Sequence, residues 1–350
     1  MEFNFLISIL IPNYNKGKYL RETLNSVWNQ KCSNWECLIV DDHSNDESWG
    51  ILEEYASKDS RFRIFKRPEI LEKGGNNCRN YAIEQSIGEY LFFLDSDDIL
   101  ADFSISQRIE TILKNPNLDF WAFSTALFEK EVSDAKYYWN LPIENESVIS
   151  RFLRMDALWQ TSGCIYKREF LIRLNGLSHN RKFWQDYELH LKALLTSSSY
   201  KIDFALKPDV FIRNGDPNSL SRSTPFSGDF QILNERISFL EEIYSFAQNA
   251  GKVLTESERY SLYSFQYFLI LQLWLKHGKF DLFCKKWKDY TSAYNLSKLI
   301  LIYGFFQALL LKANNRLKIK IKNRNSILKA FPDYYILDKV QIGRFPFRTD

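Results

Sequence analysis

Apolar runs and helix-like segments alternate along the first hundred residues of the chain. Four runs are short enough to be buried strands: 7–11, 37–40, 62–65 and 90–94. The spacing between them predicts helices over about 19–30, 48–57 and 78–85. Strand and helix alternation predicts a mainly parallel sheet flanked by helices, an α/β architecture in which ligands bind beyond the carboxyl ends of the strands.

Polar clusters follow three of these strands. They are Asn13-Tyr14-Asn15, Asp41-Asp42-His43-Ser44 and Asp95-Ser96-Asp97-Asp98. Carboxylates at a strand exit can hold a hard divalent cation against phosphate oxygens, which indicates metal-assisted chemistry on a nucleotide. If extended geometry persists to the strand end, Asp95 and Asp97 point to the same side. The alternative is that Asp95 to Asp98 only cap a turn or helix, but three clusters at one sheet edge favour a site.

The pattern changes in the second half of the chain. Residues 214–229 are rich in Gly, Pro, Ser and Asn, and 232–248 and 256–277 carry long periodic apolar faces. We therefore expect an α/β domain over 1–225 and an α-helical carboxy-terminal domain over 226–350.

Charge and cysteine content narrow the class of protein. A net charge of +3 is too small to indicate nucleic-acid binding. Five cysteines without a CxxC pair do not suit a disulfide framework, and the apolar stretch 6–11 is too short for a signal peptide. The sequence thus predicts a protein of the reducing cytoplasm.

Five segments occur in the order typical of family 2 of the glycosyltransferases, which the chain resembles over about residues 6–225. They are Ser8-Ile9-Leu10-Ile11-Pro12-Asn13-Tyr14-Asn15, Ile39-Val40-Asp41-Asp42-His43-Ser44-Asn45-Asp46, Asn77-Cys78-Arg79-Asn80, the run from Gly88 to Asp98 and Trp184-Gln185-Asp186-Tyr187-Glu188-Leu189. The resemblance implies the GT-A fold and an inverting, metal-dependent transferase.

The resemblance assigns roles to individual residues. Pro12, Tyr14, Asn15 and Asp42 would bind the nucleotide, with the Asp42 carboxylate accepting from an imide N–H, which favours UDP. Arg79, after the polar loop 74–77, would lie near the diphosphate. Asp95-Ser96-Asp97 resembles the family's DxD motif, with Asp97 and Asp95 as ligands of Mn²⁺ or Mg²⁺ and Asp95 and Ser96 near the nucleotide. Asp186 would be the catalytic base that deprotonates the acceptor hydroxyl.

The chain departs from the family pattern at two places. Gln185 stands where the family often has Glu, and it can hydrogen-bond but cannot act as a base. No His stands shortly after Arg213, where the family often has a metal-ligating one, so Asn214 or Asp216 would substitute, or Asp97 and phosphate would suffice. Further contacts to the diphosphate or acceptor are expected from Trp184, Gln185, Ser219, Ser221 and Arg222.

The carboxy-terminal part has features of a segment that binds to a membrane surface. Residues 299–311 form an apolar run that is too short to span a bilayer, and 312–330 carry seven basic and no acidic residues. Such a segment can lie on an anionic membrane, which suits a lipid-linked saccharide acceptor on the inner face of the plasma membrane. The alternative is a buried helix with a solvated basic face.

The sequence therefore predicts a cytoplasmic glycosyltransferase that moves a hexose or N-acetylhexosamine from a UDP-sugar to a saccharide acceptor in cell-surface polysaccharide synthesis. One rival is a catalytically silent sugar-nucleotide or glycan-binding scaffold. The other is a nucleotidyltransferase, against which the single glycine of the loop 13–17 counts.

Overall fold

The chain folds as two compact units. The computed structural model describes residues 5–179, 181, 184–214, 229–296, 298–317 and 343–346. The first unit comprises Met1–Glu144, Ala157–Asp216 and Gln341–Asp350, and the second comprises Asn145–Asp156 and Pro217–Val340. The domain boundary expected at 225 lies outside the described residues and stays a proposal.

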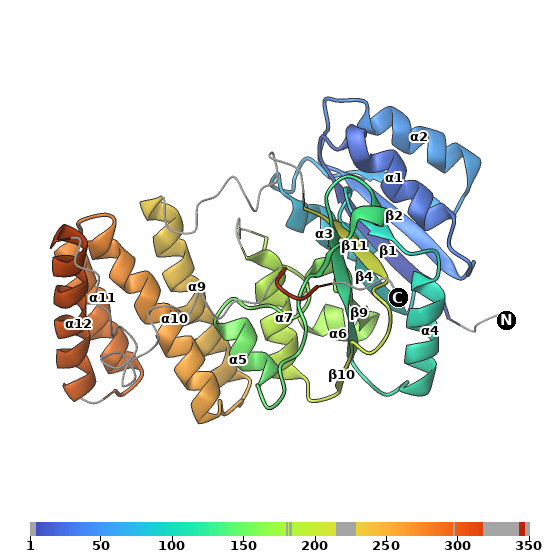
Figure 1. Cartoon of the computed structure of the whole chain (residues 1–350). Helices are drawn as coiled ribbons and strands as arrows, with labels where there is room; N and C mark the ends of the chain where they lie inside the picture. The colour runs from blue at the N-terminus through green and yellow to red at the C-terminus, as the bar shows by residue number, and fades with distance from the viewer. Residues whose placement is uncertain are drawn as a thin grey trace. The chain divides into compact units, whose positions relative to one another are not determined.

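A seven-stranded sheet forms the centre of the first unit (Figure 1). Its strands run in the order β10-β6-β9-β4-β1-β2-β3. Only β9 is antiparallel to its neighbours. The strands are β1 (Ile7–Asn13), β2 (Trp35–Asp41), β3 (Phe62–Lys66), β4 (Tyr90–Phe93), β6 (Phe120–Phe123), β9 (Cys164–Lys167) and β10 (Tyr200–Asp203). The predicted mainly parallel sheet is confirmed.

Helices cover both faces of this sheet (Figure 1). On one face, α1 (Gly17–Trp28), α2 (Ser48–Lys58) and α4 (Ser104–Lys114) pack their buried apolar residues against Ile7, Ile9 and Ile11 of β1. On the other face, α3 (Gly75–Gln85) packs against β1 and β2. The apolar periodicity predicted α1 to α3 to within three residues at each end, because an amphipathic face leaves a strong helical pattern.

A smaller sheet lies beside the acidic turn that follows β4. Its strands are β5 (Ile99–Leu100), β11 (Val210–Arg213), β7 (Thr125–Phe128) and β8 (Tyr137–Tyr138), in that order. Two helices of the first unit, α6 (Arg168–Arg173) and α7 (Gln185–Thr196), come before and after the loop that carries residues 177–181.

The second unit is helical, as the apolar faces predict. It contains α5 (Val148–Leu153), α9 (Phe230–Asn249), α10 (Glu256–Leu275), α11 (Phe280–Ala293) and α12 (Lys298–Leu317). At Gly304 of α12, an added Cβ would lie 2.4 Å from the Trp287 ring, so a glycine lets the two helices approach closely. Across the described part of the chain, no helix has both the length and the apolarity to cross a membrane.

Candidate active site

Side-chain hydrogen bonds join the carboxyl ends of β1 and β2. Asn13 Nδ2 donates to Asp41 Oδ1 at 2.8 Å and to Ser44 Oγ at 3.3 Å. The Asn15 backbone N–H donates to Ser44 Oγ, and Asn15 Oδ1 accepts from the Asn45 backbone N–H, both at 2.9 Å. The first two polar clusters therefore form one connected loop surface.

Asp42 is buried, and two donors that sequence reasoning missed hold its carboxylate. Oδ1 accepts from the Arg67 guanidinium, and Oδ2 accepts from the Gly74 backbone N–H at 2.9 Å. Gly74 has φ +147°, a conformation that favours glycine. Arg67 directly follows β3, so the strand-end rule that selected the other clusters would also have found this residue.

Pro12 and Tyr14 flank the same loop. Pro12 is the last residue but one of β1 and is half-buried. The Tyr14 ring is 42% exposed, and the Lys73 ammonium lies 3.7 Å from its centroid. An exposed ring on the loop that follows β1 is able to stack on a planar base.

The first two acidic residues after β4, Asp95 and Asp97, each pair with a cationic side chain. The strand ends at Phe93, and the Asp98 N–H closes a turn on the Asp95 carbonyl at 3.0 Å, so the extended geometry that would point Asp95 and Asp97 to the same side does not persist to the motif. The Asp95 carboxylate accepts from Arg79 Nη2 at 2.5 Å. The Asp97 carboxylate lies 2.6 Å from the Lys16 ammonium, which joins this turn to the loop after β1.

Within this turn, neighbouring carboxylates raise the pKa values of Asp97 and Asp98 because like charges lie close together. Burial and then the charge of Asp95 raise the pKa of the Asp97 carboxyl, whereas Lys16 lowers it. Burial and the charges of Asp97 and Asp95 raise the pKa of Asp98 well above its ordinary value. Ser96 is buried between them. A site with this excess of negative charge favours a bound cation.

Buried contacts fix the rest of the turn. Asp98 accepts from the Arg213 backbone N–H at 3.1 Å and from Ser162 Oγ at 3.3 Å. Arg213 Nε donates to the Asp97 carbonyl at 3.1 Å. Ser162 and Asp98 come from segments far apart in the sequence, and no local pattern marked Ser162 as part of the site.

Asp186 lies in the first turn of α7 and is half-buried. Burial is the largest effect and raises the pKa of its carboxyl; the Tyr187 N–H lowers it, the charge of Asp95 raises it and Arg79 lowers it. Asp186 is therefore within electrostatic reach of the Arg79–Asp95 pair. A carboxylate with a raised pKa is a stronger base than an ordinary aspartate.

The residues just before Asp186 form the start of α7. Trp184 is the N-cap and has φ +59°, which is a left-handed conformation. Gln185 Nε2 donates to the Arg181 carbonyl at 3.0 Å. Gln185 thus helps to hold the loop that precedes the helix, a role that the sequence did not suggest.

Asparagines of α3 hold that same loop. Residues 75–77, expected in a flexible loop, form the first turn of α3, because Gly74 caps the helix and lets it begin early. Asn76 Nδ2 donates to the Ser178 carbonyl at 2.7 Å. Asn80 Nδ2 donates to the Leu177 carbonyl at 2.7 Å, and Asn80 Oδ1 accepts from the Leu177 N–H at 2.9 Å. One helix therefore positions both Arg79 and the segment leading to Asp186.

Several residues that were expected from the sequence to contact the diphosphate, the acceptor or the metal are not seen beside Asp95, Asp97 and Asp186. Ser219, Ser221, Arg222 and Asp216 lie outside the described residues. Asn214 follows β11, and its N–H donates to the Phe128 carbonyl at 2.7 Å. Its side chain lines a different pocket on the smaller sheet.

The carboxylates fit a hard cation that also binds phosphate. The described residues contain no group of three or more His, Cys, Asp or Glu suited to hold a metal ion. Mg²⁺ usually takes only one or two carboxylates, together with substrate phosphates and water, and Asp97 and Asp95 match this number.

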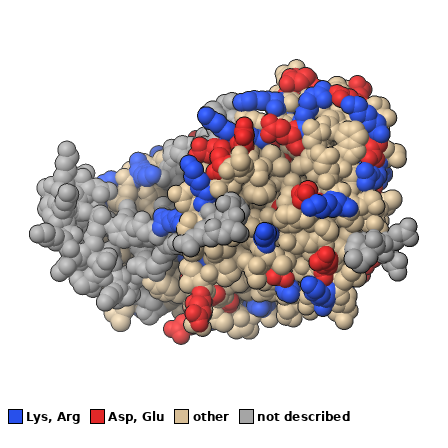
Figure 2. Space-filling view, turned by 45° about the vertical axis from the view of Figure 1, so that its right-hand side comes forward, with Lys and Arg blue, Asp and Glu red and all other residues tan. Residues whose placement is uncertain are grey.

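Figure 2 shows one face of the molecule, on which acidic and basic side chains are interspersed. This mixture is in keeping with the small net charge of the chain.

The fold of the first unit is of the GT-A type found in glycosyltransferases. S. aureus TarS 1-349 in complex with UDP-GlcNAc has a similar fold, with a TM-score of 0.66 and 19% identity over 91% of this chain and 93% of that chain. Residues 8–178 match the model of Glycosyl transferase family 2. This match covers just under half of the chain, and the expected family resemblance and fold are confirmed over it.

Relatives in bacteria carry related names. The Bacillus subtilis uncharacterized glycosyltransferase EpsJ is 27% identical over 226 residues, which are 62% of this chain and 63% of EpsJ. The Escherichia coli UDP-Glc:alpha-D-GlcNAc-diphosphoundecaprenol beta-1,3-glucosyltransferase WfgD is 34% identical over 117 residues, which are 33% of this chain and 44% of WfgD. The chain spans less than two thirds of the length of either relative. The names of several similar proteins refer to the synthesis of polysaccharides or of lipid-linked sugars.

Proposed function

We propose that this chain is an inverting, metal-dependent glycosyltransferase that transfers a hexose or N-acetylhexosamine from a UDP-sugar to a saccharide hydroxyl. The observation that carries the proposal is that four charged side chains lie near one another. Arg79 and Asp95 form an ion pair, and the other two are Asp97 and Asp186, whose carboxyl has a raised pKa. A base, cationic donors and acidic ligands at one sheet edge are the groups that sugar transfer from a nucleotide diphosphate needs.

The donor is best supported as a UDP-sugar. Asp42 is a carboxylate acceptor at the end of β2, and the exposed Tyr14 ring lies on the adjacent loop. A uracil imide N–H can donate to such a carboxylate. TarS binds UDP-GlcNAc and WfgD uses UDP-Glc, as their names state.

The residues of the chain divide the chemistry between them. Asp186 takes the proton of the acceptor hydroxyl while that oxygen attacks the anomeric carbon on the side opposite the nucleotide, so the configuration inverts. Arg79 and Lys16 supply positive charge beside the acidic turn. Asp97 and Asp95 would hold Mn²⁺ or Mg²⁺, which, when bound, stabilises the charge of the departing diphosphate as a Lewis acid.

The acceptor is proposed to be a lipid-linked saccharide, with the enzyme on the inner face of the plasma membrane. Four apolar side chains of α12 are exposed: Leu299, Ile302, Phe306 and Leu309 are 77%, 64%, 54% and 56% accessible. Their spacing places them on one side of the helix, and the basic segment 312–330 follows. An apolar stripe next to basic charge suits an anionic bilayer surface.

Calorimetric titration of UDP, GDP and dTDP with and without Mn²⁺ tests the proposal. We expect UDP to bind most tightly, with Mn²⁺ strengthening the binding, and Asp97→Asn to weaken Mn²⁺-dependent binding by about tenfold or more. Asp102→Asn is the matched control, because Asp102 is an exposed residue paired with Lys31. Binding of none of the nucleotides would favour the glycan-binding scaffold, and equal binding without metal would overturn the metal assignment.

A further inference from the structure

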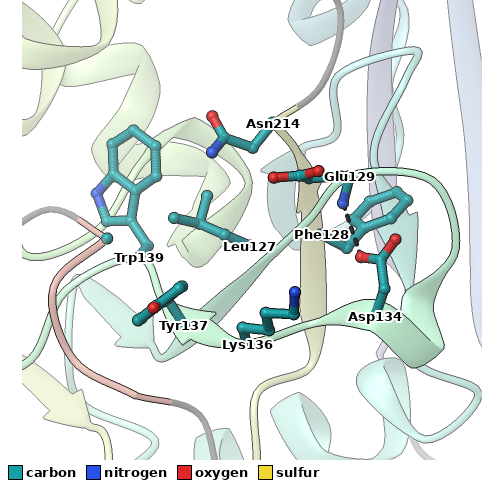
Figure 3. Close-up of a pocket in the computed structure, with 9 residues that line it drawn as sticks. Leu127, Phe128, Glu129, Asp134, Lys136, Tyr137, Trp139 and Asn214 are labelled. Carbon is teal, nitrogen blue, oxygen red and sulfur yellow. Dashed lines mark hydrogen bonds between the residues drawn. The ribbon is translucent and has the colours of Figure 1, made fainter.

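A second pocket lies on the smaller sheet of the first unit. Its volume is about 380 Å³, within the range of pockets that bind small molecules. The ends of β7 and β11, the turn before β8 and a residue near the carboxyl terminus form it (Figure 3). Only Asn214 among its lining residues was singled out in the sequence.

The pocket combines aromatic surfaces with charged side chains that the fold leaves available. Figure 3 shows Trp139 and Tyr137 on one side and Lys136 and Glu129 on the other. Among the described residues, neither the Glu129 carboxylate nor the Lys136 ammonium forms a hydrogen bond or ion pair, and the Lys136 charge acts on the nearby Asp134 carboxylate. Asp134 differs, because its carboxylate accepts from the backbone N–H groups of residues 129–131.

These groups match the chemistry of a sugar ring. The C–H face of a pyranose packs on an aromatic side chain, while its hydroxyls accept from an ammonium and donate to a carboxylate. The Glu129 and Asp134 carboxylates disfavour a phosphate, and the exposed charges disfavour an apolar ligand. A neutral saccharide fits both conditions.

Arg213 connects this pocket to the acidic turn. Its Nε donates to the Asp97 carbonyl at 3.1 Å, and its Nη1 donates to the Lys130 carbonyl at 3.2 Å. The next residue along β11, Asn214, lines the pocket. The pocket is therefore adjacent to the donor site but separate from the Asp42 loop, which points to the acceptor rather than the donor.

The end of the chain completes the pocket. The Gly343 N–H donates to the Trp139 carbonyl at 2.7 Å, and the Tyr138 N–H donates to the Phe345 carbonyl at 2.9 Å. Tyr137 and Pro346 form an antiparallel bridge. Residues 343–346 thus extend the smaller sheet beyond β8 and fix the backbone of Trp139.

We propose that this pocket binds a sugar residue of the acceptor, with Trp139 as the stacking surface and Glu129 and Lys136 as hydrogen-bonding partners. The assignment rests on the proposed function and defines the acceptor as a neutral saccharide. It also gives residues 343–346 a part in acceptor binding.

Saturation-transfer NMR with UDP and the methyl glycosides of glucose, galactose, GlcNAc and GalNAc tests the assignment. At least one glycoside should receive saturation from the wild-type protein. The signal should fall about fivefold or more in Trp139→Ala, Glu129→Gln and Lys136→Met, since each loses about one net interaction. Glu110→Gln and Lys114→Met, exposed residues of α4, are the matched controls and should keep the signal.

The UDP signals separate failure of the pocket from failure of the proposed function. Unchanged glycoside signals in all three pocket variants would overturn the assignment, as would the absence of any glycoside signal while UDP binds. Absent UDP signals in the wild type would instead contradict the donor proposal. Glu129→Gln and Lys136→Met keep the test valid if Trp139→Ala does not fold, because both side chains are at the surface.

Discussion

Asp186 shows how a single residue acquires its chemistry from its surroundings. The sequence suggested a base from the resemblance alone, whereas the structure adds a physical reason. Burial and the nearby charge of Asp95 raise the pKa of the Asp186 carboxyl. The same aspartate in an exposed first turn would be a weak base that only stabilises the helix dipole.

Asp186→Asn should lower kcat by about 10²- to 10⁴-fold, the usual range for loss of a general base. UDP affinity should stay within about twofold, because the variant keeps the size of the side chain. In the wild type, the pH profile of kcat should fall on the acidic side at a pH above the ~3.9 of an ordinary aspartate, since the base is active only when deprotonated. Retained turnover in the variant would refute the assignment.

At the scale of elements, α3 links the two halves of the site. Its Asn80 side chain forms two hydrogen bonds with the backbone of Leu177, and Gly176 lies so near that an added Cβ would be 2.5 Å from Asn80 Oδ1. Arg79, one residue earlier, pairs with Asp95. The position of α3 thus couples the loop before α7 to the acidic turn.

Asn80→Ala should reduce the free energy of unfolding by about 2–4 kcal/mol, because it leaves two buried backbone groups without their partners. It should also lower kcat more than it changes the affinity for UDP, because the loop before Asp186 loses its anchor. Urea unfolding and steady-state kinetics measure the two effects. Asn29→Ala, an exposed asparagine at the end of α1, is the control and should change neither. If Asn80→Ala is as stable as the wild type and keeps its kcat, the hydrogen bonds between Asn80 and Leu177 are not needed to hold the loop before α7.

At the scale of the whole molecule, the proposed membrane attachment involves α12 together with the basic segment 312–330. Truncation after Tyr294 would remove this helix, but it would also remove residues 343–346, which belong to the first unit and pair with its strand β8. Substitutions on the exposed stripe separate the two effects, because they leave the end of the chain in place.

Ile302→Ser with Phe306→Ser should strongly reduce co-sedimentation with vesicles that contain anionic lipid, and high salt should weaken binding of the wild type. Val253→Ser with Ile172→Ser removes exposed apolar residues elsewhere and should leave vesicle binding unchanged. If the α12 variant and the wild type bind equally, the stripe is not the membrane contact. Each variant should retain UDP binding, which shows that the first unit is folded.

The sequence by itself predicted the first four strands, the helices between them and three of the four strand ends that form the proposed site. Apolar periodicity is local, so β1 to β4 and the helices between them could be predicted, together with Asn13, Asp42 and Asp97 at their ends. Arg67 was within reach of the same rule. Tertiary structure alone decided which charges meet: Lys16 with Asp97, Arg79 with Asp95, and Ser162 and Arg213 with Asp98. These partners are up to 115 positions apart, as Arg213 is from Asp98. Their contacts depend on strand order and register, which no local pattern encodes.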